Sequence, residues 1–230
     1  MSWEWPFRRK PGGNGRDVPW IPPELGDRQG LVGVGGDLLP ETLVRAYSEG
    51  VFPWYNEGDP ILWWSPDPRA VIELDGLHVS RRLARTIRSG KFRVTVDRCF
   101  PRVMRACGET RPEGTWVTGE MLAAYTELHR RGYAHSLEVW QGDELAGGVY
   151  GVAVGGLFAG ESMFHHRTDA SKVALVALVE RLRRRGYALF DVQMKTGHTE
   201  RMGAVEIPRA EYLRRLHDAV RLTGVTFDGP

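Results

Sequence analysis

The sequence has 230 residues, of which 42% are hydrophobic, and a formal net charge of +2. This length accommodates one large domain, or a small domain joined to a medium one, with enough apolar residues for a packed core. No apolar run approaches the length of a membrane span, and the basic N-terminus lacks the apolar stretch of a signal peptide. Cys99 and Cys107 fit neither a disulfide framework nor a metal-binding spacing, and the seven histidines are scattered. We therefore expect a cytoplasmic protein with no metal site and no membrane association.

Residues 1–68 are expected to form a small N-terminal domain that is rich in proline, glycine and tryptophan. Pro40 and Gly50 are typical of the first turn and the end of a short helix. A proline-punctuated aromatic stretch follows and includes Trp54. Tryptophans in such a stretch usually belong to a core, but beside prolines they can also present a flat face to a nucleobase.

Residues 69–230 are expected to form a second, α+β domain. The pattern predicts strands at 71–74 and 92–96, with a helix near Arg81 between them, and then a helix capped by Thr118. An antiparallel meander at 135–140, 145–154 and 157–164 precedes a helix capped near Asp169, a strand at 187–193 and a helix at 211–221. This order predicts an open, mostly antiparallel sheet of the N-acetyltransferase type.

The segment from Glu161 to Arg185 contains no glycine. N-acetyltransferases usually bind the pyrophosphate of acyl-CoA on a glycine-rich turn at the corresponding place. An acyltransferase with this sequence is therefore expected to use another donor and no CoA cofactor.

Asp191 and Gln193 lie two residues apart in the last predicted strand, so their side chains should share a face. A buried aspartate needs a polar partner, and the side-chain amide of Gln193 is a suitable one. The alternative is an ordinary salt-bridged aspartate beside a surface glutamine. Glu161 and Met163 should share a face of the preceding strand by the same rule.

A run of basic residues between positions 81 and 105 forms a one-signed stripe in an almost neutral protein. This segment contains nine basic residues and only one acidic residue, Asp97. Arg81, Arg85 and Arg88 have the spacing of one helical face. Such a run is often only a solvated face, but it is also what a phosphate backbone attracts.

Eight segments, taken together and in order, resemble the leucyl/phenylalanyl-tRNA–protein transferase family. The match extends from about residue 30 to residue 217 with almost no gaps. The segments are Phe52-Pro-Trp54, Ile61-Leu-Trp-Trp-Ser-Pro-Asp-Pro-Arg69, Gly114-Thr-Trp-Val117, Ala134-His-Ser-Leu-Glu-Val-Trp140, Gly147-Gly-Val-Tyr-Gly-Val152, Gly160-Glu-Ser-Met-Phe164, Ala170-Ser-Lys172 and Asp191-Val-Gln193.

The resemblance implies a bacterial cytoplasmic enzyme with a small N-terminal domain and an acetyltransferase-like catalytic domain. It implies transfer of Leu or Phe from aminoacyl-tRNA to the N-terminal Arg or Lys of proteins, which marks them for degradation. Aminoacyl-tRNA is then a co-substrate, no further cofactor is needed, and the enzyme is expected to act as a monomer.

The resemblance also implies roles for individual residues. Catalysis is expected from Asp191 and Gln193, with Asp191 holding the amide of Gln193, which accepts from the attacking amine. Whether Gln193 removes a proton or only positions the amine stays open, and we favour positioning, with the tRNA ribose as the proton shuttle. Residues expected to bind the 3′ end of aminoacyl-tRNA are Trp54, Trp116, Phe158, Glu161 and Ser162. Those expected to line the pocket for the amino-acid side chain are Val149, Met163, Leu175, Leu178 and Phe190, although strand parity points Phe190 away from Asp191. Those expected to contact the tRNA backbone are Arg69, Arg81, Arg82, Arg85 and Arg88.

Departures from the family pattern leave the preference among Leu, Phe and Met open. Val149 and Leu178 replace residues that are often Met and Phe, and Asp169 replaces a common Asn. Met194–His198 lacks the Asn usual after the catalytic Gln. Two alternatives remain: an acyl-CoA-dependent N-acetyltransferase relative, and a non-enzymatic RNA-binding module built on the basic stripe.

Overall fold

The computed structural model describes residues 19–109 and 117–229. The N-terminal part is a three-stranded antiparallel sheet of order β1-β3-β2 with one helix against it. Its elements are η1 (Pro23–Leu25), β1 (Leu31–Val34), α1 (Pro40–Ser48), β2 (Phe52–Pro53) and β3 (Leu62–Trp64). The predicted short helix is confirmed: α1 begins at Pro40, and Gly50, whose φ is 79°, lies just beyond its end. Trp63 is fully buried there against Trp20, so these two rings belong to the core.

The rest of the chain forms a seven-stranded sheet of order β10-β4-β9-β8-β7-β6-β5. Every neighbouring pair is antiparallel except β8 and β9, which are parallel and joined by a helix. The elements are β4 (Arg69–Ile72), α2 (Arg81–Arg88), β5 (Arg93–Val96), α3 (Phe100–Glu109), α4 (Gly119–Arg130), β6 (Ala134–Gln141), β7 (Glu144–Val154), β8 (Leu157–His165), α5 (Ala170–Arg184), β9 (Leu189–Gln193), α6 (Gly197–Arg201), β10 (Ala204–Ile207) and α7 (Arg209–Ala219). The predicted fold class, an open and mostly antiparallel α+β sheet beside a small N-terminal unit, is confirmed.

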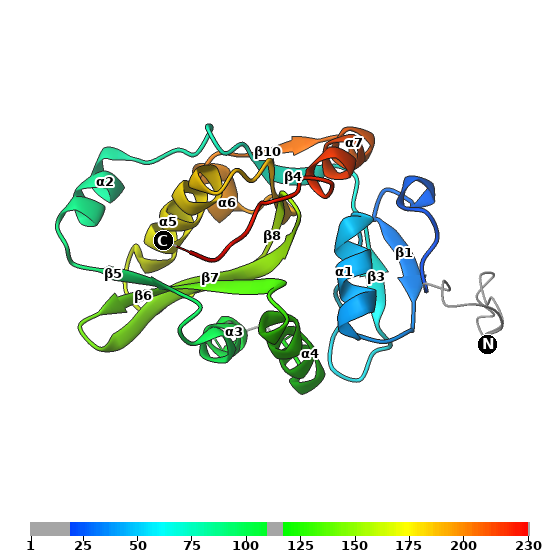
Figure 1. Cartoon of the computed structure of the whole chain (residues 1–230), viewed down its shortest axis with the longest axis horizontal. Coiled ribbons are helices and arrows are strands. Elements are labelled where there is room, and N and C mark those ends of the chain that lie inside the picture. Colours follow the sequence, from blue (N-terminus) through cyan, green and yellow to red (C-terminus); the bar gives the residue numbers. More distant parts are fainter. Residues whose placement is uncertain (1–18, 110–116, 230) are drawn as a thin grey trace.

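Helices cover both faces of the large sheet. α5 packs on one face, against β6, β7 and β8, whereas α3 and α4 pack on the other (Figure 1). Thr118 caps α4 as predicted, because its side chain accepts a hydrogen bond from the backbone N–H of Met121 at 3.2 Å. Asp169 is the residue before α5 but makes no capping hydrogen bond, since its side chain pairs with Lys172 instead.

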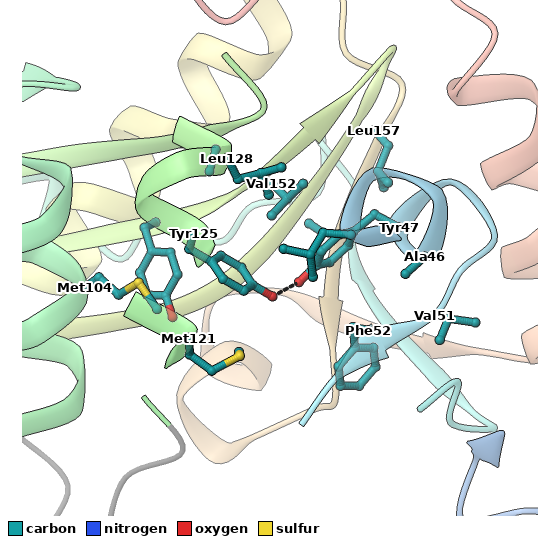
Figure 2. Packing of buried hydrophobic residues seen from close by; sticks show 14 of the residues in the cluster. Ala46, Tyr47, Val51, Phe52, Met104, Met121, Tyr125, Leu128, Val152 and Leu157 are labelled. Carbon is teal, nitrogen blue, oxygen red and sulfur yellow. Dashed lines mark hydrogen bonds between the residues drawn. The ribbon is translucent and has the colours of Figure 1, made fainter. Parts of the chain in front are cut away.

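One hydrophobic cluster joins the small unit to the large sheet. In Figure 2, Tyr47 of α1 reaches Tyr125 of α4, and their hydroxyl groups form a hydrogen bond among apolar side chains from both units. Val51 and Phe52 come from the N-terminal side of this cluster, and Val152 from the large sheet. The cluster is continuous across residue 68, and the division of the chain there stays a prediction. Among the helices in the described ranges, none has both the length and the apolar character needed to cross a bilayer.

Candidate active site

A buried ion pair connects two neighbouring strands of the large sheet. Arg69 of β4 donates from Nε to Oδ1 of Asp191 on β9 at 2.9 Å, and from Nη2 to Oδ2 at 2.7 Å. The hydroxyl of Tyr212 on α7 donates to the same Oδ2 atom at 2.9 Å. The backbone N–H of Gln193 donates to Oδ1 at 2.9 Å. The carboxylate of Asp191 therefore receives four hydrogen bonds.

The Arg69 side chain also ties the small unit to this site. Its Nη1 donates to the carbonyl of Gly50 at 3.2 Å, and its guanidinium lies 4.9 Å from the ring of Phe52 and 4.4 Å from that of Tyr212. Burial alone would lower the pKa of Arg69, but the Asp191 carboxylate raises it above its ordinary value. A buried ion pair is maintained when its remaining hydrogen-bonding groups are satisfied, as they are at Asp191.

Gln193 ends β9 in the left-handed backbone region, with φ of 57°. Its side-chain amide Nε2 donates to Oε1 of Glu161 on β8 at 2.7 Å. The expectation that Asp191 holds the side-chain amide of Gln193 is wrong: Arg69 is the partner of Asp191, and only the backbone N–H of Gln193 reaches it. The two side chains diverge because the strand is no longer extended at Gln193.

Glu161 occupies a bulge in β8. Tyr150 pairs with Ser162 and Gly151 with Gly160, so one residue is extra between these pairs. The shared face expected for Glu161 and Met163 therefore does not hold: Met163 packs against the cluster that contains α5, whereas Glu161 meets Gln193.

The electrostatic surroundings of Glu161 favour its neutral form. Burial raises the pKa of Glu161 to about 8, and the charge of Asp191 adds to the rise, although hydrogen bonds from Tyr47 and Gln193 oppose it. Burial also raises the pKa of Tyr47 and Tyr125 well above the usual value, so both hydroxyls stay protonated near neutral pH. A carboxyl group with a pKa near the working pH can exchange protons with a reacting group.

The five residues predicted to line the side-chain pocket come together in one apolar cluster. Its members include Val149, Leu175, Leu178 and Phe190, and Met163 packs against it. Phe158 belongs to the same cluster, with its ring centroid 5.9 Å from that of Phe190. Gly151 makes room for Phe158, since a Cβ there would lie 2.5 Å from the Phe158 ring.

The residues predicted to bind the tRNA 3′ end lie in different surroundings. Trp54 is 40% exposed, at the edge of the Trp64 ring, and its indole is accessible to a ligand. Phe158 and Ser162 are buried. Trp116 lies outside the described residues. Roles for these residues in binding stay predictions.

The basic stripe lies on the surface, as its predicted role requires. All nine side chains are exposed, and they come from α2, β5, α3 and the segments beside them: Arg81, Arg82, Arg85, Lys91, Arg88, Arg93, Arg98, Arg102 and Arg105. α2 lies at the opposite end of the molecule from α1 (Figure 1). Arg69 differs from the prediction: it is 1% exposed and bound to Asp191, so it does not present its charge to a tRNA backbone.

A separate cluster of Asp97, His129 and His135 brings its ligand-type atoms within 4.8 Å of one another. Nδ1 of His135 is 2.7 Å from Asp97 Oδ2, and Nε2 is 3.1 Å from the Gly132 carbonyl oxygen. Nδ1 of His129 is 2.7 Å from the carbonyl oxygen of Ala134. Hydrogen bonds within the protein thus account for the cluster, and the absence of a metal stays a prediction.

Three residues of the site were not identified from the sequence: Arg69 in its pairing role, Tyr47 and Tyr212. Tyr47 lies in α1 and Tyr212 in α7, 143 positions from Arg69. A buried arginine is rare without a carboxylate partner, so burial of Arg69 would have been the signal. The sequence alone did not show that Arg69 is buried.

The helix-linked parallel strands β8 and β9 of this α+β sheet thus carry a glutamate with a raised pKa, a buried carboxylate and a glutamine. A sequence model described as leucyl/phenylalanyl-tRNA protein transferase matches residues 71–217, and the model of its N-terminal domain matches residues 36–67. The chain belongs to the leucyl/phenylalanyl-tRNA–protein transferase family.

Curated relatives agree with this assignment. The leucyl/phenylalanyl-tRNA–protein transferase of Anaeromyxobacter sp. (strain Fw109-5) is 57% identical over 208 residues, covering 89% of this chain and 88% of the relative. That of Nitratidesulfovibrio vulgaris (strain DP4) is 56% identical over 210 residues, covering 89% and 90%. Among solved structures, L-PGS from Bacillus licheniformis matches with a TM-score of 0.42 and 12% identity, covering 64% of this chain and 48% of that chain. The family assignment rests on the sequence matches.

Proposed function

We propose that this protein transfers Leu or Phe from aminoacyl-tRNA to the N-terminal Arg or Lys of other proteins in the bacterial cytoplasm, marking them for proteolysis. The observation that carries the proposal is the hydrogen bond between Gln193 and Glu161, beside the buried Arg69–Asp191 pair, in a chain of this family. Neither substrate needs activation, since the ester of aminoacyl-tRNA is already reactive. No covalent enzyme intermediate is required.

The proposed reaction is direct aminolysis. The α-amine nitrogen of the acceptor attacks the ester carbonyl carbon, a C–N bond forms and the C–O bond to the ribose breaks. The amine loses one proton and the ribose oxygen gains one, so the reaction needs no additional reagent. An α-amine with a pKa of about 7.7–8.0 is partly neutral at cellular pH. Catalysis therefore needs orientation more than a strong base.

We assign Gln193 to orientation of the amine. Because Nε2 of Gln193 is held by Glu161, its Oε1 atom is the acceptor that would meet an amine N–H. Asp191 acts through the backbone: it binds the N–H of Gln193 and, together with Arg69, fixes where β9 ends. A neutral amide is a poor proton acceptor, so proton transfer falls to another group.

We assign proton transfer to Glu161, with the ribose as the final acceptor. Burial holds the pKa of Glu161 at about 8, close to that of the attacking amine. Its carboxylate can take the proton as the C–N bond forms and return it to the leaving ribose oxygen. From the sequence we expected Asp191 and Gln193 to aim the amine and the ribose to carry the proton. The proposal adds Glu161, on the neighbouring strand β8, as a proton carrier between the amine and the ribose.

The remaining assignments follow the family pattern and are proposals of the same kind. Trp54 and Trp116 would stack on the terminal adenosine, a contact worth roughly 1–3 kcal/mol per base. Val149, Met163, Leu175, Leu178 and Phe190 would line the side-chain pocket, supported by their clustering beside Phe158. The exposed basic stripe would contact the tRNA backbone, and the protein would act as a monomer with no cofactor besides its co-substrate.

The test is incorporation of labelled Phe or Leu from charged tRNA into an otherwise identical protein that begins with Arg, Lys or Met. Incorporation restricted to the Arg and Lys forms supports the proposal. Labelled acetyl-CoA serves as the parallel donor. Acetylation in place of aminoacyl transfer would favour the acyl-CoA alternative.

A further inference from the structure

The chain ends in a segment that crosses the large sheet on the side of α5. After α7 the backbone runs through residues 220–229 to the side of α5, where the chain ends (Figure 1). Arg181 of α5 holds this segment: Nε donates to the carbonyl oxygen of Phe227 at 2.8 Å and Nη2 to that of Gly229 at 2.8 Å. Nη2 also donates to the Phe227 carbonyl. Residues 227–229 are therefore anchored to α5.

The anchored segment inserts one aromatic ring into the core. Phe227 is 2% exposed, and its ring stacks on Phe158 at 5.3 Å between centroids and on His135 at 4.3 Å. Its edge meets Tyr187 at 6.3 Å, and the Arg181 guanidinium lies 5.0 Å from its centroid. The ring of Phe158 thus contacts both Phe190 and Phe227, with centroids 5.9 Å and 5.3 Å from its own.

Phe158 is where the C-terminal segment meets the proposed aminoacyl pocket. Phe227 belongs to the same apolar cluster as Val149, Leu175, Leu178 and Phe190. In a close-packed core, a change in the volume of one side chain shifts its neighbours, because no space is left for independent movement. The volume at position 227 therefore limits how far the ring of Phe158 can retreat from the pocket.

We propose that Phe227 is a specificity-determining residue that sets the depth of the pocket for the donor's amino-acid side chain, acting through Phe158. The inference rests on the proposed function. Hydrophobic pockets separate substrates that differ by a methylene by 10–200-fold, so small changes of depth have measurable effects. Phe227 is a positioning residue here, since it acts through the ring of Phe158.

The experiment compares kcat/KM for Phe-tRNA and Leu-tRNA in the full-length enzyme and in variants with a smaller or a larger side chain at position 227. Phe227→Ala and Phe227→Leu leave space behind Phe158, so the Phe:Leu ratio should rise, by about tenfold for Ala and less for Leu. Phe227→Trp pushes Phe158 forward, so the ratio should fall. A donor with a larger side chain, Trp-tRNA, should gain activity only with Phe227→Ala.

Phe100→Ala is the matched control, because it removes a ring that is 1% exposed from the other hydrophobic cluster. Loss of stability alone lowers transfer from both donors equally and leaves the ratio unchanged, as expected for this control. If Phe227→Ala does not fold, the test is whether the Phe:Leu ratio of kcat/KM rises in Phe227→Leu and falls in Phe227→Trp. Ratios within twofold of the wild type in all folded variants would contradict the inference. A wild-type protein that transfers neither amino acid would instead contradict the proposed function.

Discussion

Arg69 and Asp191, 122 positions apart in the sequence, form a bidentate ion pair that is 1% and 0% exposed. Removing one member leaves the other charge buried and unpaired. Asp191→Asn and Arg69→Met should each reduce the free energy of unfolding by roughly 3–5 kcal/mol. Urea denaturation measures this. Arg183→Ala, which removes an exposed ion pair with Asp75, should cost about 0–1 kcal/mol. A cost below 1 kcal/mol for Asp191→Asn would show that the pair does not organise the site.

Replacing Gln193 should affect the chemical step and not donor binding. Gln193→Ala is expected to lower kcat on the order of 10²-fold, with the Kd for charged tRNA almost unchanged. Gln193→Asn is the sharper variant, because Asn tolerates the left-handed backbone at this position yet is too short to reach Glu161 as Gln193 does. Met194→Ala, at the exposed neighbouring side chain, should leave both parameters unchanged. Weakened donor binding with normal kcat would contradict the role.

Glu161 should give the reaction a pH dependence that disappears in a neutral variant. If its carboxylate takes the proton, wild-type activity requires the deprotonated form and rises with pH through about 8. The acceptor amine also titrates near pH 8, so the quantity to measure is the ratio of wild-type to Glu161→Gln rates. This ratio should increase from pH 6.5 to pH 9. A ratio that stays constant with pH would remove Glu161 from proton transfer.

The same pKa has a consequence for stability with a defined sign. Since the pKa of Glu161 rises from 4.5 to about 8 on folding, the folded state binds an extra proton between these values. Wild-type stability should therefore fall from pH 4.5 to pH 8 relative to Glu161→Gln and then stay level. A pKa difference of one is worth about 1.4 kcal/mol, and partial exposure limits the total to roughly 1–3 kcal/mol. Denaturation curves at pH 4.5, 6.5 and 8.5 test this. A stability difference between wild type and Glu161→Gln that is the same at all three pH values would contradict it.

The basic stripe should make donor binding sensitive to salt. Each phosphate contact contributes about 0.7–0.9 to the slope of log K against log salt. Replacing Arg81, Arg82 and Arg85 by Ala should reduce that slope by about 2–3 while transfer at saturating donor continues. The control is a triple variant with Ala at Arg130, Arg131 and Arg214. These three arginines are also exposed, but each forms an ion pair with an acidic side chain. Equal slopes in the two triple variants would show that Arg81, Arg82 and Arg85 do not contact the tRNA backbone.

The parts of the fold that follow local rules were predictable from the sequence. Thr118 begins α4, Gly186 follows α5 with φ of 75°, and the three meander strands lie where alternation placed them. The strands of the small sheet, α3, α6 and β10 were missed, although Pro101 in the first turn of α3 is a typical helix-start signal. Local sequence rules therefore account for most elements.

The site was predictable only in part, because its geometry depends on distant contacts. The placement of Asp191 and Gln193 on one strand was correct. However, the backbone is left-handed at Gln193, and its side-chain amide donates to Glu161. The bulge at Glu161 breaks the alternation that the sequence suggested. Gly160, next to the bulge, is a residue type that often marks one, whereas no glycine or proline adjoins Gln193. The partner of Asp191 depends on the pairing of β4 with β9, which one sequence does not reveal.

The proposed reaction can be tested by measuring the mass of an acceptor protein after incubation with this enzyme and Phe-tRNA, followed by fragmentation of the acceptor's N-terminus. We expect a gain of one phenylalanine residue, joined by a peptide bond to the α-amine of an N-terminal Arg or Lys. The same acceptor beginning with Met should keep its mass. An unchanged Arg acceptor, or phenylalanine found on internal lysines, would rule out transfer to the N-terminal α-amine.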